Sequence, residues 1–235
     1  MGVDLAGRGI FLYFPPRVIA WGRPIDRPEN RLDVRLLGWA NLAFSRLYHQ
    51  VHLRRPPCLP PTGPAILVSN HVSGLDPLLI QSCCKRLVIW MMAHEYYDVK
   101  ALGWVYRTVR AIPVERSGRD LAATRAALRA LHDGHILGIF PEGRIAASRE
   151  LLPFQTGVAL MAIKAKVPVY PVYLDGTQRG KEMLQAVLLP NQAAITFGPP
   201  VNFDRSSTSR DALDVATEKI RDAIKCLATF KGPCV

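Results

Sequence analysis

The sequence places a histidine and an aspartate five residues apart in a short polar loop, within the stretch AILVSNHVSGLDPLLI that runs from residue 65 to residue 80. His71 is a candidate general base, because histidine titrates near pH ~6.5 and exchanges a proton close to neutrality. Asp76 could fix the tautomer of His71 and stabilise the imidazolium that forms, as the aspartate of a Ser-His-Asp triad does. Because the sequence contains no G-x-S-x-G motif, the pair is expected to activate a hydroxyl group of a substrate.

Asp76 also has a purely structural interpretation. It precedes Pro77 and an apolar run, which is typical of a helix that begins with aspartate as the N-cap and proline at the first helical position. Ser73 could cap the same helix, and it is not expected to be a nucleophile because a triad within six consecutive residues has poor geometry. The two interpretations of Asp76 are compatible, since a capping aspartate can also face a histidine.

Apolar runs and helical periodicity predict the elements that hold this loop. Strands are predicted at 65–69, 87–92, 136–140, 168–174 and 193–197. Helices are predicted at 76–84, 121–131, 156–164 and 211–227. This alternation predicts an α/β fold with a mostly parallel central sheet flanked by helices. Chemistry in such sheets gathers in the loops beyond the carboxyl ends of the strands, which is where the His-Asp loop stands.

The N-terminal part of the chain has a different character. Residues 1–60 contain nine arginines against four acidic residues, and residues 31–51 predict an amphipathic helix whose apolar face carries Leu36, Ala40, Ala43, Phe44, Leu47 and Val51. Such a helix can lie on a bilayer without crossing it, or it can pack on its own domain. A proline-rich stretch at 54–64 favours a linker. We therefore expect a membrane-associating region at 1–60 and the main domain at 61–235.

The overall charge restricts the class of partner. The chain has 30 basic and 19 acidic residues, a net charge of +11, which favours anionic partners such as a membrane surface, an acidic carrier protein or nucleic acid. The basic residues are spread out and form none of the usual nucleic-acid motifs, so nucleic acid is not an expected partner. No run approaches the roughly 18 to 20 apolar residues that span a bilayer. The five cysteines form no C-x-x-C pair, so no zinc site is indicated.

Four blocks of sequence resemble the motifs of the glycerolipid acyltransferase family, in that family's order. NHVSGLDP at 70–77 resembles the first motif, and RAIPVER at 110–116 resembles the second. FPEGR at 140–144 resembles the third, and VPVYPVYLDGT at 167–177 resembles the fourth. The resemblance covers roughly residues 64–201. By this resemblance the chain is identified as an acyltransferase of the 1-acylglycerol-3-phosphate acyltransferase type.

The resemblance implies a role for each matching position. His71 would deprotonate the acceptor hydroxyl while Asp76 orients it, and the oxygen would attack an acyl thioester directly, with no metal or redox cofactor. Arg116 would hold the acceptor phosphate, a task that suits a permanently charged, forked donor. The remaining substrate-binding positions are Asn70, Glu142, Gly143 and Arg144, of which Glu142 and Gly143 would shape the acceptor pocket.

The implied reaction moves a fatty acyl group from acyl-CoA or acyl-carrier protein to a lysophospholipid. 1-Acylglycerol-3-phosphate is the first expected acceptor, and phosphatidic acid the product. The third motif, however, reads Arg144 and Ile145 where the family usually has Thr-Arg-Ser, which favours as an alternative a lyso-aminolipid or lysophosphatidylethanolamine. The other alternative is a basic membrane-binding module without catalysis. In either case the protein is expected at the cytoplasmic face of a membrane, peripheral or monotopic.

Overall fold

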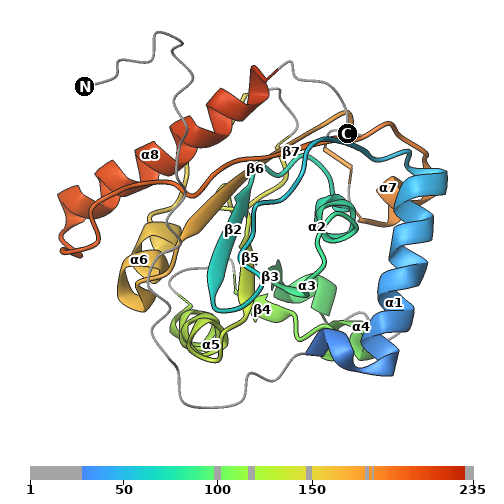
Figure 1. Cartoon of the computed structure of the whole chain (residues 1–235), viewed down its shortest axis with the longest axis horizontal. Coiled ribbons are helices and arrows are strands. Elements are labelled where there is room, and N and C mark those ends of the chain that lie inside the picture. Colours follow the sequence, from blue (N-terminus) through green and yellow to red (C-terminus); the bar gives the residue numbers. More distant parts are fainter. Residues whose placement is uncertain are drawn as a thin grey trace, which may run out of the picture.

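A seven-stranded sheet in the order β1-β7-β6-β2-β5-β3-β4 forms the centre of the molecule (Figure 1). The computed structural model describes residues 28–97, 102–115, 120–146, 150–177, 180–181 and 183–230. The strands are β1 (His52–Arg55), β2 (Ala65–Ser69), β3 (Val88–Ala93), β4 (Ile112–Val114), β5 (Ile136–Ile139), β6 (Val169–Asp175) and β7 (Ala194–Phe197). The helices are η1 (Pro28–Asn30), α1 (Leu32–Ala43), η2 (Phe44–Tyr48), α2 (Asp76–Gln81), α3 (His94–Tyr97), α4 (Gly103–Thr108), α5 (Leu121–His132), α6 (Gly157–Ala165), α7 (Met183–Leu188) and α8 (Arg210–Ala228).

The strand pairing confirms the α/β fold expected from the sequence. Neighbouring strands pair in parallel throughout, except that β7 runs antiparallel to β6. β2 lies at the centre, between β5 and β6, which agrees with its fully buried run AILVS. The sequence did not predict β1, which pairs with β7 at the edge of the sheet. The sheet therefore begins before the proline-rich stretch, within the region that was assigned to residues 1–60.

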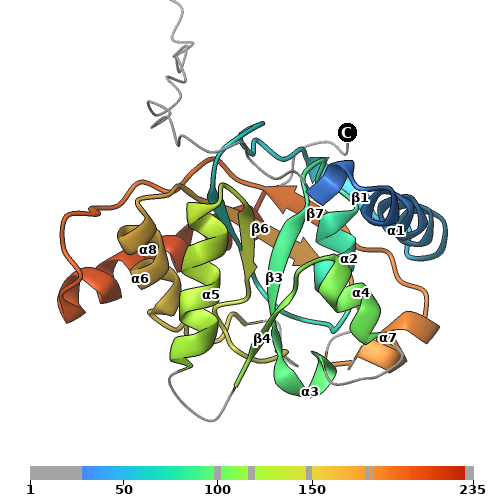
Figure 2. The same ribbon diagram turned by 90° about the horizontal axis from the view of Figure 1, so that it is seen from below.

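Two layers of helices cover the sheet (Figure 2). Side chains of successive strand residues point to opposite faces, so Leu67 and Ile66 of β2 enter different halves of the core. Leu67 packs in the half that α2, η2 and α7 cover. Ile66 packs in the half that α5, α6 and α8 cover. Because β2 and β5 are parallel neighbours, the loops after them leave the sheet at the same edge.

Much of the apolar face predicted at 31–51 lies in solvent, although Phe44 packs against the core and Val51 is buried in it. Leu36 is 60% exposed and Leu47 is 82% exposed, although both belong to the face that the sequence predicts as apolar. The opposite, more polar side contacts the domain: the Asn41 side chain donates a hydrogen bond to the Leu78 carbonyl at 2.9 Å, and Ser45 is fully buried. In the part of the chain that the structure describes, no helix combines the length and apolar character needed to cross a membrane.

Candidate active site

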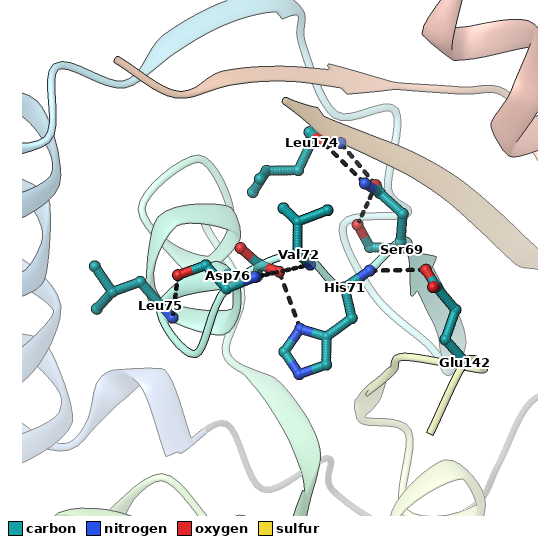
Figure 3. A network of polar contacts seen from close by, with 9 residues as sticks. Ser69, His71, Val72, Leu75, Asp76, Glu142 and Leu174 are labelled. Carbon is teal, nitrogen blue, oxygen red and sulfur yellow. Dashed lines mark hydrogen bonds and ion pairs between the residues drawn. The ribbon is translucent and has the colours of Figure 1, made fainter. Parts of the chain in front are cut away.

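His71 and Asp76 meet directly in the loop that follows β2 (Figure 3). Nδ1 of His71 lies 2.9 Å from Oδ2 of Asp76. The aspartate is fully buried, whereas the histidine side chain is 15% exposed. A buried carboxylate that accepts the Nδ1 proton leaves Nε2 as the basic nitrogen of the ring. In Figure 3 this second nitrogen points away from Asp76, as a group that receives a proton from a substrate must.

Asp76 is not the N-cap of α2, so the capping interpretation is wrong. The N-cap is Leu75, and Asp76 is the first residue of the helix. Its Oδ2 points backward and accepts hydrogen bonds from the backbone N–H groups of Val72 at 2.7 Å and Ser73 at 3.0 Å. One carboxylate oxygen thus closes the loop and also holds His71. The proline within the first turn of α2 supplies the rigid start that places this carboxylate.

Glu142 holds the backbone of His71 from the other side (Figure 3). Its Oε1 accepts a hydrogen bond from the His71 N–H at 2.9 Å, and its Oε2 accepts one from the Leu152 N–H at 3.1 Å. The His71 carbonyl in turn accepts a hydrogen bond from the Ala146 N–H at 2.7 Å. Burial raises the pKa of the Glu142 carboxyl, and the two N–H donors partly offset that shift. Both oxygens of Glu142 therefore face backbone donors, a geometry that favours a positioning role over the acceptor contact that the sequence suggests.

Asn70 joins the end of β2 to the end of β6. Its side-chain NH₂ donates to the Leu174 carbonyl at 2.8 Å, and its side-chain oxygen accepts from the Leu174 N–H at 2.9 Å. The residue is 3% exposed, so its carboxamide is committed to the backbone of a neighbouring strand. This reciprocal pair extends the sheet by one step and fixes the point at which the loop turns toward His71.

Two of the other predicted substrate-binding residues, Gly143 and Arg144, lie in the loop after β5. Gly143 has a φ of +69°, and a Cβ atom built on it would lie 2.5 Å from Nε2 of Gln155. The positive φ favours glycine at this position, and any larger residue would also have to displace the Gln155 side chain. Arg144 is exposed and lies two residues before Ala146, whose N–H binds the His71 carbonyl. Arg116 lies outside the described residues, so its role as the phosphate ligand stays a prediction.

Sequence reasoning missed three residues that support the His71 ring. Phe140 stacks on His71 with a centroid distance of 4.1 Å and an interplanar angle of 17°. Trp90 stacks on the other side of Phe140 at 4.8 Å and 12°. A Cβ on Gly138 would lie 2.4 Å from the Trp90 ring, so only glycine leaves room for the indole. A glycine inside a buried strand signals such a close approach, and it was the clue available in the sequence.

The arrangement suits proton transfer to and from a substrate better than covalent catalysis. Ser73, the nearest hydroxyl in the loop, is fully buried, and its oxygen accepts a hydrogen bond of 3.4 Å from the Leu75 N–H. It is therefore not presented to a substrate. What the loop does present is a histidine that is oriented by a carboxylate, at the carboxyl edge of a mostly parallel sheet. An oriented histidine of this kind can deprotonate a hydroxyl or amine that attacks a bound electrophile.

The fold and this His-Asp site define an α/β protein equipped for general-base catalysis. Comparison with known families makes the class specific: the model of the Acyltransferase family matches residues 50–175. That match covers more than half of the chain and includes His71, Asp76 and Glu142. The chain therefore belongs to the Acyltransferase family, as its four motifs indicate.

The names of individual relatives refer to several different lipids. The chain is 25% identical over 170 residues to 1-acyl-sn-glycerol-3-phosphate acyltransferase of Bacillus subtilis, a match that covers 71% of this chain and 82% of that protein. It is 30% identical over 173 residues to N-acylphosphatidylethanolamine synthase of Arabidopsis thaliana, covering 62% of this chain and 58% of the relative. It is 33% identical over 91 residues to lyso-ornithine lipid O-acyltransferase of Rhodobacter capsulatus, covering 38% and 32%.

A solved structure supports the fold. The crystal structure of the 1-acyl-sn-glycerophosphate acyltransferase PlsC from Thermotoga maritima superposes with a TM-score of 0.61, over 88% of each chain, at 20% sequence identity. At this level of identity the likeness concerns the fold.

Proposed function

We propose that the protein transfers a fatty acyl group from an acyl thioester to a hydroxyl group of a lysophospholipid, by direct general-base catalysis. The observation that carries this proposal is the 2.9 Å contact between His71 Nδ1 and Asp76 Oδ2, with the opposite ring nitrogen directed away from the carboxylate. Membership in the Acyltransferase family supports the reaction type. Acyl-CoA or acyl-carrier protein would be the donor.

The reaction needs one base and no covalent enzyme intermediate. Nε2 of His71 takes the proton of the acceptor hydroxyl as its oxygen attacks the thioester carbonyl carbon, and Asp76 stabilises the imidazolium that results. Collapse of the tetrahedral intermediate breaks the carbon–sulfur bond. The departing thiolate then receives the proton from His71, which gives an ester, a free thiol and the original neutral histidine.

The first acceptor to consider is 1-acylglycerol-3-phosphate, which would give phosphatidic acid. The similarity to the Bacillus subtilis protein, most of whose length is matched, supports this choice. Arg116 would hold the phosphate, and Arg144, which is exposed beside the loop that binds His71, could contribute a second positive charge.

A second candidate is a lysolipid without a phosphate monoester. Two observations favour it: the third motif has apolar Ile145 directly after Arg144, and the chain resembles a lyso-ornithine lipid acyltransferase over 91 residues. An exposed single arginine next to an apolar residue would suit a head group with less negative charge than a phosphate monoester. In this case the His-Asp chemistry is unchanged and only the acceptor pocket differs.

The enzyme would work at a membrane surface, with α1 as a contact. Leu32, Leu36 and Trp39 form an exposed apolar stripe on α1, and Arg35 borders it. α4 and α7 lie at the same end of the molecule as α1 in both views, and they expose Trp104 and Leu188 (Figures 1 and 2). Apolar and tryptophan side chains beside arginines fit the interface of an anionic bilayer. Lysophospholipids reside there, so this placement would bring the acceptor to the site.

The test is acyl transfer by the purified chain in mixed micelles. Radiolabelled palmitoyl-CoA and palmitoyl-acyl-carrier protein would be supplied with lysophosphatidic acid, lysophosphatidylethanolamine or lyso-ornithine lipid. Wild type, His71→Ala and Asp76→Asn would be compared. Loss of the general base is expected to lower kcat by roughly 100- to 10,000-fold, and the asparagine variant should lose a large part of that activity because it favours the wrong tautomer.

The acceptor panel separates the two candidates. Labelled phosphatidic acid that disappears in His71→Ala would support the first, and labelled ornithine lipid alone would support the second. A product that persists at the wild-type rate in His71→Ala would refute the mechanism for both. If the purified chain acylates nothing yet still binds lipid vesicles, the protein acts as a binding module.

A further inference from the structure

His71 is held at several points, and one of them lies outside the hydrogen-bond network. Glu142 and Ala146 fix its backbone, and Asp76 holds one ring nitrogen. An imidazole that is anchored only by its Cβ–Cγ bond and by one hydrogen bond can still tilt about the axis between these two anchors. The direction of Nε2 toward a substrate therefore depends on what supports the flat face of the imidazole.

That support is a column of three nearly parallel rings. The His71 imidazole lies on the Phe140 ring at 4.1 Å, and Phe140 lies on the Trp90 indole at 4.8 Å, with interplanar angles of 17° and 12°. The residues come from three neighbouring strands: Trp90 belongs to β3, Phe140 follows β5, and His71 lies beyond β2. A flat surface behind the imidazole restricts the tilt that the Asp76 contact leaves free.

The column has a fixed base. Trp90 is 8% exposed and pairs in register with Gly138 of the adjacent strand β5. The indole occupies the space where a side chain at 138 would stand, since a Cβ there would lie 2.4 to 2.7 Å from three of its ring atoms. Phe140 is thus stacked between two rings, His71 on one face and Trp90 on the other. The segment that carries Phe140 also carries Glu142, so it holds both the backbone and the ring of His71.

We propose that Phe140, backed by Trp90 over Gly138, is a positioning residue that sets the plane of the His71 imidazole and so aims Nε2 at the acceptor. This inference deepens the proposed function and rests on it. Phe140 acts through His71 and needs no contact with the reacting atoms. Removing the aromatic ring at position 140 should therefore lower kcat more than it weakens the binding of either substrate.

The kinetic test compares Phe140→Leu with Phe140→Tyr. Leucine keeps an apolar side chain but removes the flat surface, so we expect kcat to fall roughly 10- to 100-fold with KM for donor and acceptor nearly unchanged, as misaligned reacting groups cause. Tyrosine keeps the ring and should restore most of kcat. Gly138→Ala displaces Trp90 without touching His71 and should lower kcat in the same direction by a smaller factor.

Two comparisons separate positioning from general destabilisation. Leu131→Ala opens a cavity in the opposite half of the core, and at a matched loss of unfolding free energy it should leave kcat nearly unchanged. In the His71→Ala background, Phe140→Leu should have no further effect, because groups that act as a unit are not additive. The proposal is overturned if Phe140→Leu retains wild-type kcat, if Phe140→Tyr is equally impaired, or if the loss persists without His71.

A readout without turnover keeps this inference separate from the proposed function. NMR of the protein labelled at histidine, with the His71 signals assigned by His71→Ala, should show ring C–H resonances shifted upfield by the Phe140 ring. The shift should vanish in Phe140→Leu and persist in Leu131→Ala. Ordinary shifts in the wild type would refute the column. An upfield shift in a protein that acylates no acceptor would instead leave the column standing and refute the proposed reaction.

Discussion

The helices α1 and α8 have similar amphipathic patterns in the sequence, but their apolar faces lie in different environments. Each carries apolar residues at helical spacing, yet Ile220 and Ile224 of α8 are fully buried while Leu36 and Trp39 of α1 are 60% and 66% exposed. α8 also has a serine N-cap, since the Ser209 hydroxyl accepts from the Ala212 N–H, whereas α1 has no side-chain cap. Periodicity thus identifies an amphipathic helix without saying which environment receives its apolar face.

The two helices contribute differently to the protein. Both sides of α8 have partners within the domain. Its apolar stripe packs against the sheet, and ion pairs such as Lys225–Asp222 lie on its outer side. α1 contacts the domain through the buried Val34 and through Asn41, which donates a hydrogen bond to the Leu78 carbonyl, and its apolar stripe is exposed. From this contrast we expect α8 residues to control folding and α1 residues to control association with lipid.

The largest expected difference concerns unfolding. Ile220→Ala should lower the free energy of unfolding by about 2 to 5 kcal/mol, because it leaves a cavity in a close-packed core. Leu36→Ala should change it by less than about 0.5 kcal/mol, since the side chain is already in solvent. Urea denaturation followed by circular dichroism measures both. A cost for Leu36→Ala comparable to that of Ile220→Ala would show that the α1 stripe is covered by protein.

The second effect should appear only in lipid. Trp39→Ala removes the largest side chain of the α1 stripe and should weaken binding to vesicles by a factor of about 10 to 100, which corresponds to the roughly 1.5 to 3 kcal/mol of burying a large apolar side chain. Val215→Ser on α8, a residue that is 57% exposed, is the matched control and should leave binding unchanged. Cosedimentation with vesicles that contain phosphatidylglycerol measures both. Equal loss in the two variants would contradict a specific role for α1.

The fold could largely be predicted from the sequence because its signals are local. Runs such as 65–69 and 136–139 are continuous and fully buried, and helices α5 and α8 have clear periodicity and side-chain N-caps. β1 escaped prediction because its HLRR sequence has no apolar run, and it is a strand only by pairing with β7. The face of α1 that contacts the domain could not be predicted, because it depends on hydrogen-bond partners in segments far away in the sequence.

The site could be predicted only where its contacts are close in sequence. The spacing of His71 and Asp76 made their contact possible and the family resemblance predicted it, and the structure places the two atoms 2.9 Å apart. The contacts of Glu142 and Asn70 were not predictable, because each bonds backbone groups of a strand or loop many residues away. The column of Phe140 and Trp90 depends on the register of β3 with β5, which no local pattern specifies.

A smaller effect on the free energy of unfolding should come from the protonation of a second histidine, His49, which lies where η2 joins the domain. His49 is fully buried edge-on to the rings of Phe44 and Tyr48 at 4.5 and 4.9 Å. Burial lowers the pKa of His49, and the nearby Asn191 carboxamide only partly offsets the shift. The folded protein therefore prefers neutral His49, so this contribution to stability is present above the ordinary histidine pKa and is lost as pH falls below it.

The comparison to make is the unfolding free energy between pH 7.5 and pH 5.5 in wild type and His49→Leu. The wild type should lose more stability on acidification than the variant, because leucine takes up no proton. The control is Leu131→Ala on α5, which lowers stability without removing a titratable group and should leave the slope with pH unchanged. If wild type and His49→Leu show the same slope, His49 does not titrate differently in the folded and unfolded states.

The smallest effect should separate the charge of α1 from its apolar stripe. Arg35 is exposed at the border of the stripe, and neutralising it should weaken binding to anionic vesicles by about 1 kcal/mol, or roughly fivefold. Arg35→Gln should have no such effect on zwitterionic vesicles or at high salt, where the attraction is screened. Arg210→Gln at the start of α8 is the matched control. An equal loss from both substitutions would mean that the net charge of +11 acts over the whole surface, and that α1 differs from α8 only in its apolar side chains.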